Sequence, residues 1–162
     1  MSNEVDRTEP VAPDVTFRAR SPRRELLRVH VPVLVVISFG GGLGAAARYG
    51  LALLLPTRPD QFPWGTFTVN VVGCLLIGVL MVLITDVWSA HRLVRPFLGV
   101  GILGGFTTFS TYAVEIRNLL HPGSVGVAFG YLAGTLIGAM LAVLVGMWLT
   151  RTVTRSTRER SV

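Results

Sequence analysis

Residues 104–112 read Gly-Gly-Phe-Thr-Thr-Phe-Ser-Thr-Tyr, and they lie in the middle of an otherwise apolar stretch from about residue 97 to residue 120. Two adjacent glycines followed by hydroxyl residues disfavour an uninterrupted helix. Non-helical backbone at membrane depth is tolerated only where it is buried in protein or lines a watery cavity. The segment therefore suggests a helix broken at its centre, where freed carbonyls can hold a cation. A kinked helix whose hydroxyls bond their own carbonyls fits the physical pattern equally well.

Four apolar stretches, including this one, are long enough to cross a bilayer, which takes about 20 apolar residues. They cover about residues 33–55, 64–84, 97–120 and 125–149. The whole chain is 51% hydrophobic and only 15% charged, whereas soluble domains carry about 25% charged residues. The sequence predicts an all-α integral membrane protein with four transmembrane helices, the third of them broken or kinked at its centre.

Polar composition divides the chain into three parts. Residues 1–30 are rich in arginine and proline and offer little apolar surface to offset the entropy of ordering, so we expect this N-terminal segment to be disordered. Residues 31–150 hold the four spans as one four-helix domain, and residues 151–162 form a short basic tail.

All fifteen basic residues are arginines, and they lie almost entirely outside the apolar stretches. A net charge of +6 would also suit a nucleic-acid binder, but arginines at the chain ends and in loops indicate lipid headgroups rather than nucleic acid as the partner. One side of the membrane receives twelve arginines, and the other receives only Arg58 and Arg117. The positive-inside rule predicts a multi-pass protein of the cell inner (plasma) membrane with both termini cytoplasmic.

Small residues recur at every fourth position of the last span. They are Gly126, Gly130, Gly134, Gly138, Ala142 and Gly146. Helices in lipid associate by close packing, which small residues permit. We expect these residues to form a packing seam without chemistry of their own.

Two polar side chains stand out within the first two spans. Asn70 is flanked by apolar residues, so its amide must face the bundle interior. There it can clamp a neighbouring helix or donate N–H groups to an anion. Arg48 lies near one end of the first span, where we expect its side chain to snorkel to the interface, with ion pairing or attraction of an anion as the alternatives. Glu115 lies near a helix end and can pair with Arg48 or Arg117.

Aromatic and hydroxyl side chains also share helix faces. Phe109, Tyr112 and Glu115 follow one another at intervals of three, and Tyr131 and Thr135 are four apart. An aromatic ring has a positive edge that can face an anion. Packing alone also accounts for such pairs.

Three motifs resemble those of the CrcB/Fluc family of fluoride channels, over about residues 35–150. Residues 104–112, together with Glu115, resemble the family's third-helix signature. Residues 65–73, Gly-Thr-Phe-Thr-Val-Asn-Val-Val-Gly, are similar to its second-helix motif. Residues 41–49, Gly-Gly-Leu-Gly-Ala-Ala-Ala-Arg-Tyr, are similar to its first-helix opening. Three motifs in this order within one short chain make a specific signal.

The resemblance implies an antiparallel dimer with two fluoride pathways and a central, structural sodium ion (Na+). The sodium would be held by backbone carbonyls at Gly104 and Thr107. Arg48 and Glu115 would lie near the pore entrances. The residues that the resemblance places along the fluoride pathway are Asn70, Phe109, Thr111, Tyr112, Tyr131 and Thr135.

Two of the positions depart from the family pattern. Tyr112 stands where the family usually has a second phenylalanine, and Ala139 stands where a further hydroxyl is common. A phenol changes the ring's edge and its hydrogen bonding. We therefore expect one of the two pathways to be altered or silent.

The function that the resemblance implies is passive export of fluoride from the cytoplasm. The chain shows no acid–base pair or nucleophile that would indicate an enzyme. A small multidrug-type cation exporter is one alternative, but it needs a membrane-embedded carboxylate in the first span, which carries Arg48 instead. A non-conducting assembly subunit is the other, because glycine seams would suffice for it.

The arginine bias bears on the dimer. A chain that pairs with itself in antiparallel fashion must insert both ways, and this requires nearly balanced charges on the two sides. Twelve arginines against two are not balanced. We therefore predict a heterodimer with a homologous subunit of opposite orientation.

Overall fold

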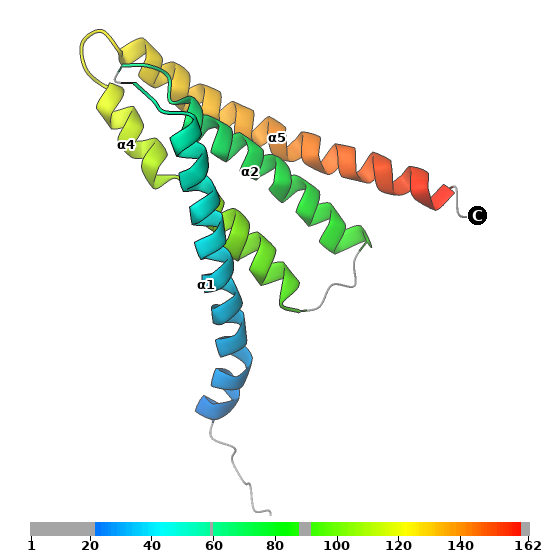
Figure 1. Ribbon diagram of the computed structural model, residues 1–162. Helices are drawn as coiled ribbons and strands as arrows, with labels where there is room; N and C mark the ends of the chain where they lie inside the picture. Colours follow the sequence, from blue (N-terminus) through cyan, green and yellow to red (C-terminus); the bar gives the residue numbers. More distant parts are fainter. Residues whose placement is uncertain (1–21, 59, 88–91, 160–162) are drawn as a thin grey trace, which may run out of the picture.

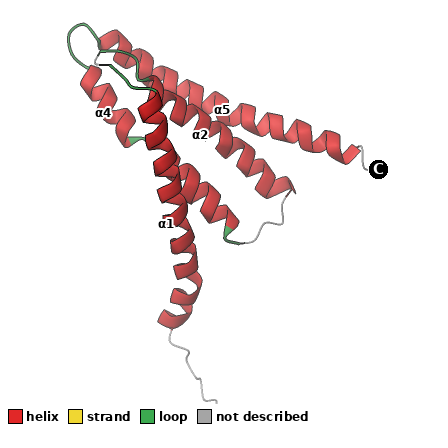
Figure 2. Cartoon of the chain, viewed as in Figure 1, coloured by secondary structure: helices red, strands yellow, loops and turns green. Residues whose placement is uncertain are grey.

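The computed structural model describes residues 22–58, 60–87 and 92–159, with the side chains of residues 30–156 within these ranges. Throughout this described part, the chain consists of helices and connecting loops, and no strand occurs (Figure 2). The elements in chain order are α1 (Pro22–Leu54), α2 (Trp64–Val82), the π-helical segments η1 (Leu83–Val87) and η2 (Pro96–Leu103), α3 (Gly104–Phe106), α4 (Ser110–Leu119) and α5 (Val125–Glu159).

Four helical segments have the length and hydropathy needed to cross a membrane. They are His30–Leu54, Trp64–Asp86, Pro96–Leu119 and Val125–Ser156. The prediction of an all-helical protein with four membrane-spanning helices is thereby confirmed. Between 11% and 22% of the residues in these apolar segments are buried within the chain, so lipid or a partner must cover most of the apolar surface.

Helix α1 begins earlier than the sequence analysis expects. Residues 22–30, assigned there to a disordered segment, are helical, whereas residues 1–21 lie outside the described residues. The sequence Pro22-Arg23-Arg24-Glu25-Leu26-Leu27 explains the early start, because proline suits the first turn of a helix and the residues after it are good helix formers.

The helices are arranged in two pairs. Helix α2 packs along α5, and α1 packs along η2 and α3. The two pairs meet near the α1–α2 loop and diverge towards their other ends, so that α1 and α5 point in different directions (Figure 1). After Phe109 the chain leaves the pair formed by α1 with η2 and α3, and α4 packs against α5, which links the two pairs.

Glycine makes the contact within each pair possible. A Cβ atom at Gly78 would overlap the Val143 carbonyl oxygen, and one at Gly146 would overlap that of Leu75. The expected seam on α5 is therefore real where α5 faces α2. The contact does not extend along the whole seam, however, because no atom of the described residues lies within 4 Å of a Cβ built at Gly126, Gly130 or Gly134.

Candidate functional site

The third membrane-length segment is interrupted next to the two glycines. Helix α3 ends at Phe106, and Thr107 has extended backbone with φ −73° and ψ 155°. The last regular bond before the interruption runs from the Thr107 amide to the Leu103 carbonyl at 3.0 Å. Helix α4 then starts at Ser110. Residues 107–109 thus form a short non-helical segment between two helices.

Asn70 of α2 holds this segment by two hydrogen bonds to one residue. Its Nδ2 donates to the Thr108 carbonyl at 3.0 Å, and its Oδ1 accepts from the Thr108 amide at 2.9 Å. Both backbone groups of a residue outside the helices are thereby satisfied, as buried polar groups require. Of the two roles that the sequence left open for Asn70, the structure shows the clamp.

The hydroxyl of Thr108 starts the next helix. It donates to Oγ1 of Thr111 at 3.0 Å, accepts from the Thr111 amide at 3.2 Å and lies 3.3 Å from Oγ of Ser110. Thr108 is buried. Backbone amides in the first turn of a helix have no carbonyl acceptor within that helix. The Thr108 hydroxyl supplies an acceptor for one of them, the amide of Thr111.

These contacts free two backbone carbonyls. A helical carbonyl is normally bonded by the amide four residues later. The Thr108 amide bonds to Asn70 and the Thr111 amide bonds to the Thr108 hydroxyl, so the carbonyls of Gly104 and Thr107 lack these usual donors. They are the same two carbonyls to which the family resemblance assigns the sodium ion.

Close packing of α2 on the interruption depends on Gly73. A Cβ atom at this position would overlap Cγ2 of Thr107 and would lie 3.3 Å from Cδ1 of Phe106. Gly73 is buried and follows Asn70 by three residues, so both lie on one face of α2. The clamp and the close approach therefore act together.

A row of aromatic rings leads away from the interruption. Phe109 is 78% exposed, and its ring centroid lies 5.8 Å from that of Tyr112. Tyr112 meets Tyr131 of α5 edge to face at 5.1 Å, and its hydroxyl donates to the Leu132 carbonyl at 2.8 Å. Tyr131, which is fully buried, is in turn 5.2 Å from Phe62. The row runs from a ring open to the surroundings to one enclosed between helices.

Glu115 lies at the inner end of this row. Its Oε2 accepts a 2.6 Å hydrogen bond from the Tyr131 hydroxyl, and its Oε1 accepts one of 2.8 Å from Thr66 of α2. Helices α2, α4 and α5 therefore meet at a single carboxylate. In the described part of the chain, the two ion pairs join His121 to Asp60 and Arg151 to Asp86, so the expected pairing of Glu115 with an arginine does not occur there.

Thr135 lies one helical turn beyond Tyr131 on α5. Its side chain is 5% exposed, and among the described residues its Oγ1 has no hydrogen-bond partner. A buried hydroxyl without a partner is uncommon and calls for an explanation. Arg48, in contrast, is half-buried on α1 and belongs to none of these contacts.

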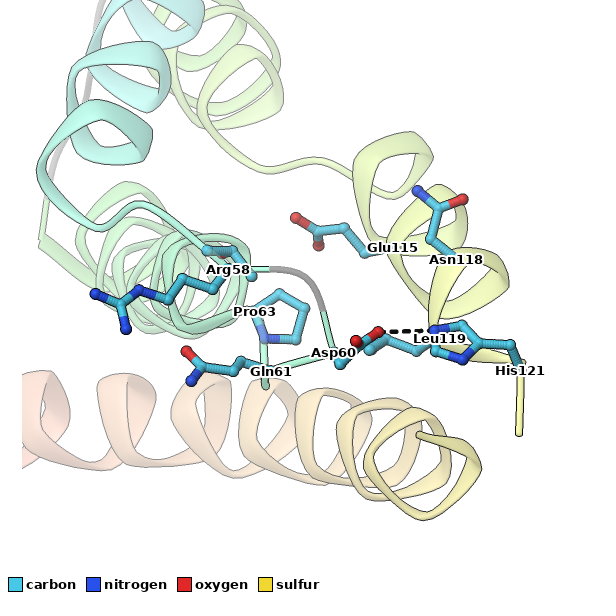
Figure 3. Close-up of a pocket in the computed structure, with 9 residues that line it drawn as sticks. Arg58, Asp60, Gln61, Pro63, Glu115, Asn118, Leu119 and His121 are labelled. Carbon is cyan, nitrogen blue, oxygen red and sulfur yellow. Dashed lines mark ion pairs between the residues drawn. The ribbon is translucent and has the colours of Figure 1, made fainter. Parts of the chain in front are cut away.

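A cavity of about 480 Å³ opens at the end of the bundle beside Glu115. It lies between the α1–α2 loop and the end of α4, with the carboxylate of Glu115 on one side and Pro63 on the other (Figure 3). An ion pair of 2.8 Å between His121 and Asp60 joins the two walls. The lining residues are Thr57, Arg58, Asp60, Gln61, Pro63, Glu115, Asn118, Leu119 and His121.

Most of the side chains singled out in the sequence come together in two groups. Asn70 and Thr111 meet through Thr108 at the interruption, and the aromatic row with Glu115 follows it. Thr66, quoted only as part of the motif at residues 65–73, precedes Asn70 by four residues and thus shares its helix face. Thr108, quoted only as part of a motif, proves to be the central residue of the interruption.

Comparison with known proteins adds an independent observation. The family model described as "CrcB-like protein, Camphor Resistance (CrcB)" matches residues 35–147. The chain belongs to this family. The match begins within α1, covers the second and third membrane-length segments in full and ends within α5.

Individual relatives carry a more specific name. "Fluoride-specific ion channel FluC 2" of Streptomyces avermitilis is 58% identical over 124 residues, which are 76% of this chain and 78% of that protein. "Fluoride-specific ion channel FluC 2" of Nocardia farcinica is 56% identical over 127 residues, 78% of this chain and 91% of that protein. A second protein of Streptomyces avermitilis, "Fluoride-specific ion channel FluC 3", is 42% identical over 124 residues, 76% of this chain and 61% of that protein.

Proposed function

We propose that this chain is a subunit of a fluoride-selective channel, through which fluoride leaves the cytoplasm passively. Family membership and the names of the relatives support this function. The structural observation that carries it is the row of rings from the exposed Phe109 to Tyr131, with the unpartnered Thr135 hydroxyl one turn further. Fluoride must exchange its water shell for O–H, N–H and ring-edge contacts that bind it weakly enough for release.

Asn70 can take part in this pathway as well as hold the interruption. The amide nitrogen carries two hydrogens, and Thr108 uses one of them. The second is a donor for fluoride as it passes the interruption. Phe109, whose ring is exposed next to this site, supplies a ring edge at the same level.

We also propose that the interruption lies at the centre of the bilayer and that it holds Na+ at a dimer axis. Sodium is a hard cation and prefers oxygen ligands, and the carbonyls of Gly104 and Thr107 lack their usual helical donors. The ion would hold two interruptions together without taking part in fluoride movement. Among the described residues no cluster of three acidic, histidine or cysteine side chains offers a competing site.

The dimer would be antiparallel, and its contact surface would include the open part of the α5 seam. Among the described residues, nothing lies within 4 Å of a Cβ built at Gly126, Gly130 or Gly134, and such faces favour helix contacts in lipid. The arginine bias supports both termini in the cytoplasm of an inner-membrane protein and a homologous partner of opposite orientation. Two relatives come from one organism, Streptomyces avermitilis, and a heterodimer of homologous subunits requires two such proteins in one cell.

The two alternatives receive less support. A proton-coupled cation exporter needs a carboxylate that exchanges protons readily, whereas Glu115 accepts hydrogen bonds from two hydroxyls. A non-conducting subunit would need only the glycine packing faces, which leave the row of aromatic rings and the buried Thr135 hydroxyl unexplained.

Fluoride efflux from proteoliposomes, followed with a fluoride electrode, tests the proposal. The chain is reconstituted alone and after co-expression with a homologous second subunit, and empty vesicles serve as the control. We expect release with the pair and little release with the chain alone. Proton-driven uptake of a cationic dye would favour the exporter, and silence of every combination would favour the assembly subunit. Efficient release by the chain alone would refute the heterodimer but not the channel.

A further inference from the structure

The last helix is much longer than a membrane is thick. Helix α5 has 35 residues, which span about 52 Å at 1.5 Å per residue, whereas the hydrocarbon core of a bilayer measures about 30 Å. Its uninterrupted run of apolar residues ends at Leu149, before Thr150 and Arg151, and the last ten residues, 150–159, continue as helix. This extension must therefore pass through the headgroup region.

A contact with the second span shows where α5 leaves the apolar core. The second membrane-length segment ends at Asp86, and Asp86 Oδ2 lies 3.8 Å from Nε of Arg151. A carboxylate and a guanidinium thus lie at the same level on neighbouring helices. Arg155 is one turn further, about 6 Å along the axis, which still falls within a headgroup layer of about 5–8 Å on each side.

One face of the extension combines an aromatic ring with arginines. Trp148, Arg151 and Arg155 follow one another at spacings of three and four residues, and Arg158 continues the series. Trp148 is 65% exposed, and Arg151 and Arg155 are exposed as well. Tryptophan next to arginine at the end of an apolar helix is the usual composition of a membrane interface.

The hydroxyl side chains described between residues 150 and 156 bond to their own helix. The hydroxyls of Thr150, Thr152 and Thr154 donate to the carbonyls of Gly146, Leu149 and Thr150 at 2.8–2.9 Å. The ion pair of Arg151 is long and exposed, and such pairs hold weakly. In the described part of the chain Arg155 forms no ion pair. Among the described side chains of this stretch, Arg151 and Arg155 are therefore the groups that remain for an outside partner.

We propose that this face of α5 is a binding site for the phosphate groups of anionic lipids. Guanidinium groups bind phosphate through paired N–H donors. Trp148 and Asp86 place these arginines at the membrane interface, where lipid headgroups lie. The phosphate is therefore that of a lipid headgroup. This proposal requires only that α5 cross the membrane. Lipid binding by α5 is a role separate from fluoride conduction.

Fluorescence quenching of Trp148 tests the proposal in the full-length chain. Trp64 and Trp88 are replaced by phenylalanine, and the protein is reconstituted in phosphatidylcholine vesicles. The vesicles contain an equal fraction of brominated phosphatidylglycerol or of brominated phosphatidylcholine. A basic residue near an anionic surface contributes about 1 kcal/mol, or about fivefold in local lipid concentration. We expect brominated phosphatidylglycerol to quench Trp148 more strongly than brominated phosphatidylcholine does. High salt should reduce this difference.

Variants assign the effect to this face. Arg151→Gln/Arg155→Gln/Arg158→Gln should remove the preference, whereas the corresponding lysine variant should keep most of it. Asp86→Asn should strengthen it, because the competing carboxylate charge is lost. Arg58→Gln, near the other end of the bundle, is the matched control and should leave it unchanged. Equal quenching by both lipids in the parent protein, or a preference that survives the glutamine variant, overturns the proposal.

Discussion

The phenolic oxygen of Tyr131 lies 2.6 Å from Oε2 of Glu115, and this hydrogen bond joins α5 to the helix that follows the interruption. Thr66 of α2 donates to the other carboxylate oxygen. A carboxylate within the apolar bundle is costly unless its oxygens are bonded. The two hydroxyls thus satisfy both oxygens of Glu115 at the junction of three helices, beside the cavity at the end of the bundle.

Tyr131→Phe should lower stability and transport together. It keeps the ring but removes one of two donors to Glu115, and a hydrogen bond to a charged group contributes about 1.5–3 kcal/mol. We expect a lower melting temperature in detergent and about tenfold or greater loss of fluoride efflux. Tyr49→Phe, at an exposed tyrosine on α1, is the control. Wild-type stability in Tyr131→Phe would show that the bond is unimportant.

Asn70→Ala should loosen the interruption more than Thr108→Val does. The first variant removes both bonds to the Thr108 backbone and leaves two buried backbone groups unpaired, at a cost of about 1–3 kcal/mol each. The second removes the hydroxyl contacts but leaves those backbone groups paired. Hydrogen exchange of the amides at 107–111 measures the difference. Equal protection in the two variants would contradict the clamp.

Gly73→Ala should be harmful, and Thr107→Ser should partly rescue it. The added methyl overlaps Cγ2 of Thr107, and overpacking of this kind costs about 1–3 kcal/mol. Serine lacks that methyl. We expect Gly73→Ala to lower the melting temperature and the double variant to regain part of it. Additive losses in the double variant would mean that this contact is not the cause.

Tyr112→Phe tests whether the phenol restricts the pathway. The substitution removes the bond to the Leu132 carbonyl and leaves the ring that the family usually has here. The freed ring can turn its edge towards a passing anion. We expect faster fluoride efflux from proteoliposomes containing this variant and its partner subunit, at unchanged protein content. Slower efflux would show that the hydroxyl supports conduction.

Hydropathy alone was enough to predict the four spans, because crossing a bilayer requires long apolar runs wherever the helices pack. The pairing of those spans was not predictable in this way. The glycines of α5 recur evenly in the sequence, yet only those from Gly138 onward contact α2. A small residue on a membrane helix can face lipid, a partner subunit or a neighbouring helix of the same chain. The sequence pattern therefore does not show which of these contacts each glycine. The early start of α1 was missed because an arginine-rich stretch with proline also suits disorder.

The candidate site was predictable as a set of residues but not as a set of contacts. Asn70 had to face inward, and its two possible roles differed only in what lay opposite, which turned out to be the Thr108 backbone. Thr66 shares the helix face of Asn70, but a single threonine in a membrane helix usually bonds its own backbone. Its bond to Glu115 depends on how α2 and α4 pack, which local sequence does not specify.

Thr135→Val separates a role in transport from a role in folding. The Oγ1 atom is buried, and among the described residues it has no partner, so its removal costs no hydrogen bond within the chain. Valine has nearly the same shape, and relief of an unpaired polar group should leave stability unchanged or raise it by about 1 kcal/mol. If the hydroxyl instead bonds to fluoride, efflux should fall severalfold in the same variant. Thr152→Val, whose hydroxyl bonds its own helix, should leave efflux unchanged. A stable Thr135→Val protein that still conducts at the parental rate would exclude this hydroxyl from the fluoride pathway.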